Sequence, residues 1–196
     1  MAVLSPIDPE EITVLEREWG PFARMAHDVL ISASSLDYWL QRVPKKRRGE
    51  VGMLILDPEG KALIHTKPHY PEGTFRIPTG GIKPRERVLA AVLREAWEET
   101  GLQVAVERLL AVLEYRFTDG ERELRFATYL FVLRSDGSEA LPQDEDEQIA
   151  ELRKMDVSGL GGLADSLEGL DGKWSDWGRF RALSHRAAVQ CLDGKR

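Results

Sequence analysis

The sequence predicts an α/β protein, in which a mixed β-sheet is covered by helices and extended by helical segments at both ends. Short apolar runs separated by turn residues occupy much of the middle of the chain, as expected of strands. Apolar residues recur instead at helical spacing near both ends and in one central segment. The 196 residues, 42% of them hydrophobic, suffice for one domain with a sizeable core and extensions.

Residues 1–48 are expected to form a helical N-terminal extension. Its first apolar stripe consists of Ile12, Leu15, Trp19 and Phe22. Its second apolar run includes Leu36, Trp39, Leu40 and Val43. Gly20 and Pro21 separate the two, and Pro44 is expected to end the second helix.

Residues 49–157 are expected to form the central core, a mixed sheet with one helix across it. The predicted strands include Val51 to Leu56, Ala62 to Thr66, Val104 to Tyr115 and Glu123 to Leu133. Asp57 to Gly60 predicts a hairpin turn between the first two. Residues 158–196 should pack on this core as a loop or short helix followed by a helix over Trp174 to Leu192.

The helix expected between Pro84 and Gly101 concentrates acidic side chains. Its apolar stripe consists of Leu89, Val92 and Ala96. Glu95 and Glu99 are one turn apart with Glu98 beside them, so their like charges need either water or a cation. Mg²⁺ accepts carboxylate oxygens and shares its remaining sites with substrate phosphates, so this spacing is compatible with a metal site.

Two further residues support this acidic group. Arg94, four residues before Glu98, can hold one carboxylate in place through its planar guanidinium. Glu86 is expected in the first turn of the helix, where a negative charge suits the helix dipole.

The segment from Gly80 to Leu102 resembles the signature of the Nudix hydrolases, G-x5-E-x7-R-E-U-x-E-E-x-G-U, in which U is an apolar residue. Every specified position is filled, by Gly80, Glu86, Arg94, Glu95, Ala96, Glu98, Glu99, Gly101 and Leu102. From average composition, a random match somewhere in the chain has a probability on the order of one in a million. Two departures are Thr79, where many members have glycine, and Lys83, where many have an acid.

The resemblance implies a Nudix-type α/β/α sandwich and a metal cofactor, Mg²⁺ with Mn²⁺ as an alternative. The implied metal ligands are the backbone of Gly80 and the side chains of Glu95, Glu98 and Glu99. It further implies that Arg94 orients a glutamate and that Glu86 supports the loop and a peripheral metal.

The implied reaction is hydrolysis of a diphosphate linkage by attack of water on phosphorus. A carboxylate must accept the proton of that water, and Glu95 is the first candidate. The acidic run Asp144 to Glu147, together with Glu151, supplies the alternatives, among which we favour Glu147.

The expected substrate is a nucleoside diphosphate derivative, with ADP-ribose or a nucleotide sugar slightly favoured. Nucleoside or deoxynucleoside triphosphates and dinucleoside polyphosphates are the alternatives within the enzyme class. A non-catalytic, nucleotide-sensing Nudix module is the alternative from another class. Isomerisation of an isoprenoid diphosphate ranks last, because it would want a cysteine in the core and Cys191 lies far down the terminal helix.

The residues expected to contact substrate are Arg76, Lys67 and Tyr70, close before the signature. For the neighbouring His65 and His69, packing or surface roles are favoured. The C-terminal segment interleaves Trp174 and Trp177 with Arg179, Arg181 and Arg186. Such a segment either packs onto the domain or a dimer partner, which we favour, or stacks on a nucleotide.

The net charge of −6 and the isoelectric point near 5.4 argue against a broad nucleic-acid-binding surface. The basic run Lys45 to Arg48 is interpreted as a solvated linker, with a phosphate-steering rim as the alternative. No apolar run approaches the length of about 20 residues needed to span a membrane. With Cys191 as the single cysteine, we expect a cytoplasmic protein without an intrachain disulfide, and a homodimer is left open.

Overall fold

The computed structural model describes residues 6–194, except for the side chains of residues 44–46 and 145. Its helices are α1 (Pro9–Trp19), α2 (Ala33–Lys46), α3 (Val88–Thr100), α4 (Leu160–Glu168) and α5 (Ser175–Asp193). Its strands are β1 (Ala23–Leu30), β2 (Gly49–Leu56), β3 (Ala62–Thr66), β4 (Thr79–Ile82), β5 (Val104–Thr118), β6 (Glu123–Ser135) and β7 (Glu151–Met155). Three short 3₁₀ turns are η1 (Glu145–Glu147), η2 (Val157–Gly159) and η3 (Gly172–Trp174).

The strands form one mixed sheet, as predicted, in the order β1-β5-β6-β2-β3-β7. β1 runs parallel to β5 and β2 runs parallel to β6, while the other pairs are antiparallel. β4 pairs with the first half of β2, from Gly49 to Gly52, and β3 meets the end of β2 at Leu56. The two glycines of β4 are therefore held against the centre of the sheet.

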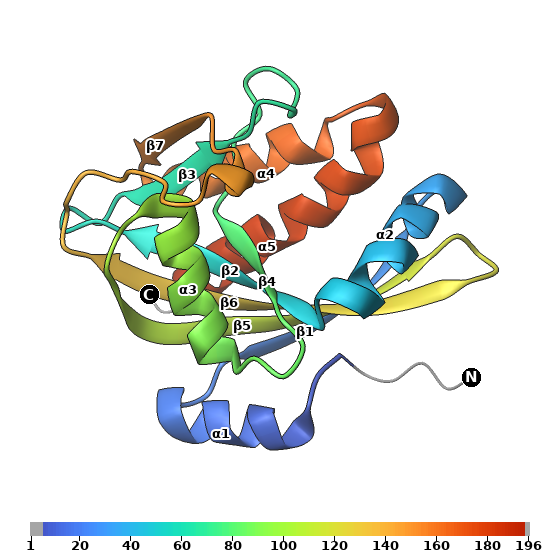
Figure 1. The fold of residues 1–196 in the computed structure, drawn as a ribbon, viewed down its shortest axis with the longest axis horizontal. Helices are drawn as coiled ribbons and strands as arrows, with labels where there is room; N and C mark the ends of the chain where they lie inside the picture. The colour runs from blue at the N-terminus through green and yellow to red at the C-terminus, as the bar shows by residue number, and fades with distance from the viewer. Residues whose placement is uncertain (1–5, 195–196) are drawn as a thin grey trace.

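Helices cover both faces of the sheet, which gives the predicted α/β/α sandwich (Figure 1). Along β2, Val51 and Met53 pack into the apolar cluster that includes residues of α1 and α3. Leu54 and Leu56 pack into the opposite cluster, which includes residues of α2 and α5. Every residue of β2 is buried, as expected for a strand covered on both faces.

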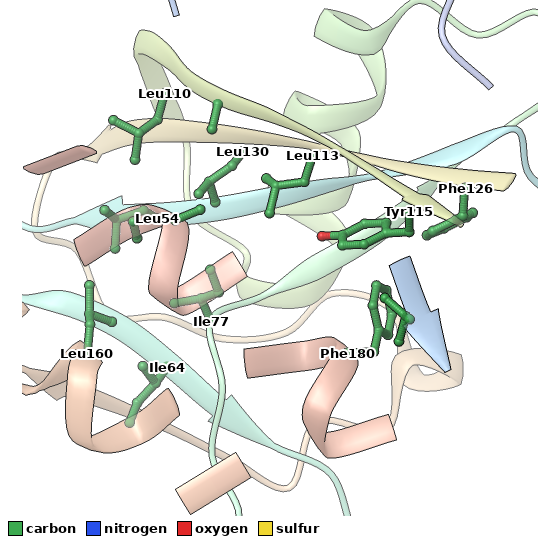
Figure 2. Packing of buried hydrophobic residues seen from close by; sticks show 14 of the residues in the cluster. Leu54, Ile64, Ile77, Leu110, Leu113, Tyr115, Phe126, Leu130, Leu160 and Phe180 are labelled. Carbon is green, nitrogen blue, oxygen red and sulfur yellow. The ribbon is translucent and has the colours of Figure 1, made fainter. Parts of the chain in front are cut away.

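Phe180 anchors α5 to the sheet, as Figure 2 shows beside Tyr115 and Phe126. Its ring meets those of Tyr115 and Phe117 edge to face, at centroid distances of 5.0 and 5.1 Å. Trp39 of α2 adds a further edge contact to the same ring at 5.6 Å. Because edge-to-face contacts constrain orientation, they fix the first turns of α5 relative to α2.

The interpretation of residues 1–48 as wholly helical is wrong in one part. Residues 23–30 form strand β1, paired in parallel with β5 along its full length. Ala23, Met25 and Val29 contact the apolar cluster, which is the two-residue period of a strand. The prediction that Pro44 ends the second helix is also wrong, because α2 continues to Lys46.

The start of the acidic helix also differs from the prediction. α3 begins at Val88, so Pro84 is not its first residue and Glu86 is not in its first turn. A tight turn precedes it, in which the Glu86 amide donates to the carbonyl of Lys83 and the Lys83 amide donates to the Glu86 carboxylate. The end of α3 agrees with the prediction, since Gly101 adopts the left-handed conformation with φ of 68°.

Candidate active site

The three glutamates of α3 lie where this helix packs against β2 and β4. Glu95 and Glu99 are buried, with 5% and 1% of their surfaces exposed, and Glu98 is partly exposed. Val92 and Ala96 of the predicted apolar stripe are fully buried beside them. Two acidic side chains are thus carried on the face of α3 that turns toward the sheet.

Gly80 allows Glu95 to lie directly against the backbone of β4. A Cβ atom at Gly80 would lie 2.0 Å from the Glu95 Oε2 atom, far inside van der Waals contact. This position therefore requires glycine because of the close approach of the carboxylate, and it places that carboxylate beside the Gly80 backbone.

Arg94 connects three glutamates. Its Nη1 donates to Glu95 Oε1 at 2.8 Å and to Glu98 Oε2 at 2.7 Å. Its Nε and Nη2 donate to the two oxygens of Glu86 at 2.7 and 2.8 Å, and Nη2 also donates to the carbonyl of Gly81. The hydrogen bond from Arg94 is the main reason that the pKa of Glu86 is lowered. Arg94 therefore orients carboxylates, which is the geometry that the resemblance implies.

Burial gives the glutamates unusual electrostatics. Loss of solvation raises the pKa of Glu95, and it raises the pKa of Glu99 to about 8. In the described part of the chain, Glu99 Oε2 has no hydrogen-bond partner. Hard carboxylate oxygens that are buried and incompletely paired suit a divalent cation such as Mg²⁺ chemically. The donor set therefore fits the implied metal.

The same carboxylates are nevertheless engaged by cations of the protein. Among the described residues, no group of three or more His, Cys, Asp or Glu side chains is arranged to hold a metal ion. Arg94 binds oxygens of Glu95 and Glu98, and Lys67 lies 3.5 Å from Glu99 Oε1. The metal ligand set, Gly80 with the three glutamates, consequently stays a prediction.

Glu147 reaches the same site from η1. Lys67 Nζ donates to Glu147 Oε2 at 2.8 Å, and the same ammonium lies near Glu99. The carbonyl of Glu98 accepts from the amides of Gln143 and Asp144, which ties the acidic loop to the end of α3. Desolvation acts to raise the pKa of Glu147, but the hydrogen bond and charge of Lys67, together with Glu99 and Arg76, outweigh it and the pKa is lowered.

A cavity of about 790 Å³ opens beside these acids and is bounded by α2, β4, the segment before β4 and the start of α5. Of the candidate general bases, Glu95 and Glu147 line it. Asp144 instead accepts a hydrogen bond from the amide of Asp146, and Glu151 pairs with Arg153. The side chain of Glu145 lies outside the described residues.

All three residues predicted to contact substrate line this cavity: Arg76, Lys67 and Tyr70. Arg76 is 3% exposed, and it donates to the Tyr70 hydroxyl, the carbonyl of Ile77 and the Thr79 hydroxyl. Thr79, a departure from the family pattern, thus has a defined partner. Lys67 is engaged by Glu147 and Glu99, and its predicted contact with phosphate stays a prediction.

Sequence reasoning missed the contribution of α2 to the cavity. Tyr38 and Arg42 line it, with the guanidinium carbon of Arg42 lying 3.7 Å from the centroid of the Tyr38 ring. Their i, i+4 spacing was a usable signal, although the apolar run on the same helix gave no reason to assign them to a site.

The basic run divides into two parts. Arg48 forms an ion pair with Glu11 and donates to the carbonyl of Glu86, so it supports the fold. Arg47 lines the cavity. The side chains of Lys45 and Lys46 lie outside the described residues.

Comparisons with known proteins agree with the sequence signature. The chain is 33% identical over 88 residues to mouse diphosphoinositol polyphosphate phosphohydrolase 3-alpha, covering 45% of this chain and 50% of that protein. It is 28% identical over 112 residues to the NAD-capped RNA hydrolase NudC of Chromobacterium violaceum, covering 57% and 39%. The chain therefore spans half or less of the length of these curated relatives.

A solved structure of a UDP-X diphosphatase has the same fold. It aligns with 97% of this chain and 73% of its own, with a TM-score of 0.50 and 18% identity. Within residues 6–194, no helix is long and apolar enough to cross a membrane. A family model for the NUDIX domain matches residues 46–178, well over half of the sequence, and the chain therefore belongs to this family.

Proposed function

We propose that this protein is a metal-dependent Nudix pyrophosphohydrolase that cleaves the diphosphate linkage of a nucleoside diphosphate derivative. One observation carries the proposal. Glu95 of α3 and Glu147 of a distant loop face one cavity, together with the buried cation of Arg76. Acids that hold a metal or accept a proton, next to a cation that binds phosphate, form the combination that diphosphate hydrolysis requires.

Each group has a proposed role. Glu95, Glu98 and Glu99, with the backbone of Gly80, would hold Mg²⁺ or Mn²⁺. When bound, such an ion neutralises the diphosphate and lowers the pKa of a coordinated water. Arg94 orients two of these carboxylates through its hydrogen bonds. Because Glu95 and Glu147 both line the cavity, both stay candidates for the base that accepts the water's proton.

The relatives support a diphosphate substrate. The mouse relative is named for diphosphoinositol polyphosphates, and the bacterial relative is named for NAD-capped RNA. Diphosphoinositol and NAD both contain a diphosphate linkage, which is the group that a buried cation beside a metal site can bind. We favour ADP-ribose or a nucleotide sugar, ahead of nucleoside triphosphates and dinucleoside polyphosphates. Cytoplasmic location and homodimer formation stay predictions.

A substrate screen tests this proposal. The purified protein would be incubated with Mg²⁺ or Mn²⁺ and ADP-ribose, nucleotide sugars, dinucleoside polyphosphates, nucleoside triphosphates or a diphosphoinositol polyphosphate, and the products identified. We expect metal-dependent cleavage within the diphosphate of one of the first two groups. If no compound is cleaved but a nucleotide raises the melting temperature, a nucleotide-sensing module is the better description.

A further inference from the structure

One side of the cavity is lined by aromatic rings whose positions are only partly explained by packing. Trp177 packs against a small apolar cluster that includes Ala164, Leu167 and Ala182. Trp174 belongs to none of the apolar clusters formed by the described residues. Its ring contacts in this part of the chain are with His69, Tyr70 and Trp177, and it stays partly exposed in the cavity wall.

These rings form an open aromatic box, defined here as Trp174, Trp177 and Tyr70. The two indoles meet at 75° with centroids 5.3 Å apart, and Trp174 meets Tyr70 at 77° and 6.0 Å. Trp177 and Tyr70 are closer, at 4.8 Å. His69 also stacks on Trp174, at 26° and 6.3 Å, so the part of the Trp174 ring that stays exposed in the cavity is the surface that can meet a planar group from a ligand.

The charges around the aromatic box determine which kind of ligand it can bind. Arg76 donates to the Tyr70 hydroxyl and has no ion-pair partner among the described residues. Arg181, which lines the same cavity, is neutralised by Glu50 at 2.7 Å. Lys173 lies 5.6 Å from the Trp174 ring. A cationic guest would be repelled here, whereas a planar group joined to an anion suits both the rings and Arg76.

The two helices beside the aromatic box are tied together. Asp176, in the first turn of α5, accepts from the amide and hydroxyl of Ser32 and from the hydroxyl of Ser35. Ser32 is the N-cap residue of α2. The carboxylate therefore satisfies groups at the start of α2 and holds its position against α5. Such a fixed wall reduces the cost of ordering a site around a ligand.

We propose that the aromatic box stacks the base of a nucleoside phosphate and that Arg76 binds the attached phosphate. This inference rests on the proposed function, because it places the diphosphate between the box and the acids of α3. It also separates two substrate classes. A phosphorylated inositol would gain from Arg76 and Lys67 but has no planar face for Trp174, whereas a nucleotide uses both.

Binding of AMP and ribose 5-phosphate tests the aromatic box. The two probes differ only in the base, and neither contains a diphosphate that the enzyme could cleave. Calorimetry would compare the wild type with Trp174→Ala, Trp174→Phe and Trp97→Ala, all in Mg²⁺ buffer. Trp97 is the matched control, because it is 45% exposed on α3 and does not line the cavity.

We expect Trp174→Ala to weaken AMP binding about tenfold, as expected for the loss of one base-stacking ring, and to leave ribose 5-phosphate unchanged. Trp174→Phe should keep most of the AMP affinity, and Trp97→Ala should keep all of it. If Trp174→Ala does not fold, as judged by circular dichroism, Trp174→Leu removes the aromatic face while keeping apolar volume.

Equal weakening of both probes, or AMP binding that does not depend on Trp174, would overturn the inference. So would inositol hexakisphosphate binding more tightly than AMP and independently of Trp174. The test is separable from catalysis. If AMP binding depends on Trp174 but no substrate is hydrolysed, the base-stacking role of the aromatic box stands and the proposed hydrolase function is refuted. If a nucleotide is hydrolysed but AMP binding does not depend on Trp174, the base-stacking role is refuted and the proposed hydrolase function stands.

Discussion

The acidic group of α3, which reaches the cavity through Glu95, and the aromatic box in the wall of the same cavity are built in opposite ways. Glu95, Glu98 and Glu99 belong to a single helix, where residues four apart lie on the same side. The aromatic box takes Tyr70 from the segment after β3, Trp174 from η3 and Trp177 from α5. The difference teaches that the groups for chemistry can be encoded locally, while the groups for recognition depend on how distant elements pack.

If these two regions act separately, substitutions in one should leave the function of the other intact. We expect the largest effect from Glu98→Gln or Glu99→Gln, which should lower kcat by about two orders of magnitude or more, because each removes a carboxylate that would bind the proposed metal. Binding of AMP through the aromatic box should persist. Steady-state kinetics and calorimetry on the same samples measure both quantities.

Glu107→Gln is the matched control, since Glu107 is exposed and pairs with Arg134 on the surface. Added Mg²⁺ should raise the melting temperature of the wild type and of this control more than that of Glu99→Gln. Undiminished turnover in Glu98→Gln or Glu99→Gln would contradict the proposal that these glutamates bind the metal. Loss of AMP binding in these variants would show that the two regions are not independent.

Gly80→Ala should have the next largest effect, because the added Cβ would occupy the space of the Glu95 carboxylate. We expect kcat to fall roughly tenfold or more, with AMP affinity retained, because only the acids are displaced. Gly161→Ala is the control, since a Cβ there meets no atom within 4 Å and alanine suits the first turn of α4. Equal activity of the two variants would contradict the close approach of Glu95 to β4.

The same contrast explains which parts of the fold could be predicted. β2, β3 and the end of α3 at Gly101 follow local patterns, and the prediction for each is close to the structure. β1 was missed because the two-residue alternation of Ala23, Met25 and Val29 is short and follows a helical stripe. Its pairing with β5, far along the chain, supplies the backbone partners that make it a strand.

Prediction of the site shows the same limit. Arg94 could be placed beside Glu98 from helical spacing alone, and the structure has this contact. The contact of Arg94 with Glu86 could not be predicted in this way, because Glu86 lies in a turn that was expected to be helix. Trp174 and Trp177 could not be told apart from the sequence, where packing was favoured for their segment and stacking on a nucleotide was the alternative. The tertiary structure shows that both line the cavity, and that of the two only Trp177 also packs against an apolar cluster of the described residues.

Asp176→Ala should affect the aromatic box while sparing the acids. Without the carboxylate, the amide and hydroxyl of Ser32 lose their partner and α2 is less firmly held against α5. We expect KM for the nucleotide substrate to rise several-fold with kcat nearly unchanged. The melting temperature should fall by a few degrees, which corresponds to the free energy of about one or two hydrogen bonds to a charged group. Asp28→Ala, at an exposed ion pair with Arg116, is the control. A fall in kcat with unchanged KM would link Asp176 to the acids instead.

The smallest expected effect concerns His185, which connects α5 to the segment before β4. Its Nε2 accepts from the amide of Ile77, just before β4, and its Nδ1 donates to the carbonyl of Arg181 in α5. Burial lowers the pKa of His185 to about 4, because the charged imidazolium loses solvation. In the unfolded chain the same group titrates near its ordinary pKa of 6.5.

Between about pH 4 and pH 6.5, the folded and unfolded pKa values of His185, the unfolded chain binds more protons at this residue than the folded protein does. The contribution of His185 to the free energy of unfolding therefore rises with pH across this range and is lost as the pH falls. We expect the melting temperature to fall by a few degrees between pH 7 and pH 4.5, and His185→Gln to make that fall shallower, although its starting stability is lower. Differential scanning calorimetry across this range measures both slopes. An equally steep fall in the variant would assign the acid sensitivity to other groups and leave His185 as a packing residue between α5 and β4.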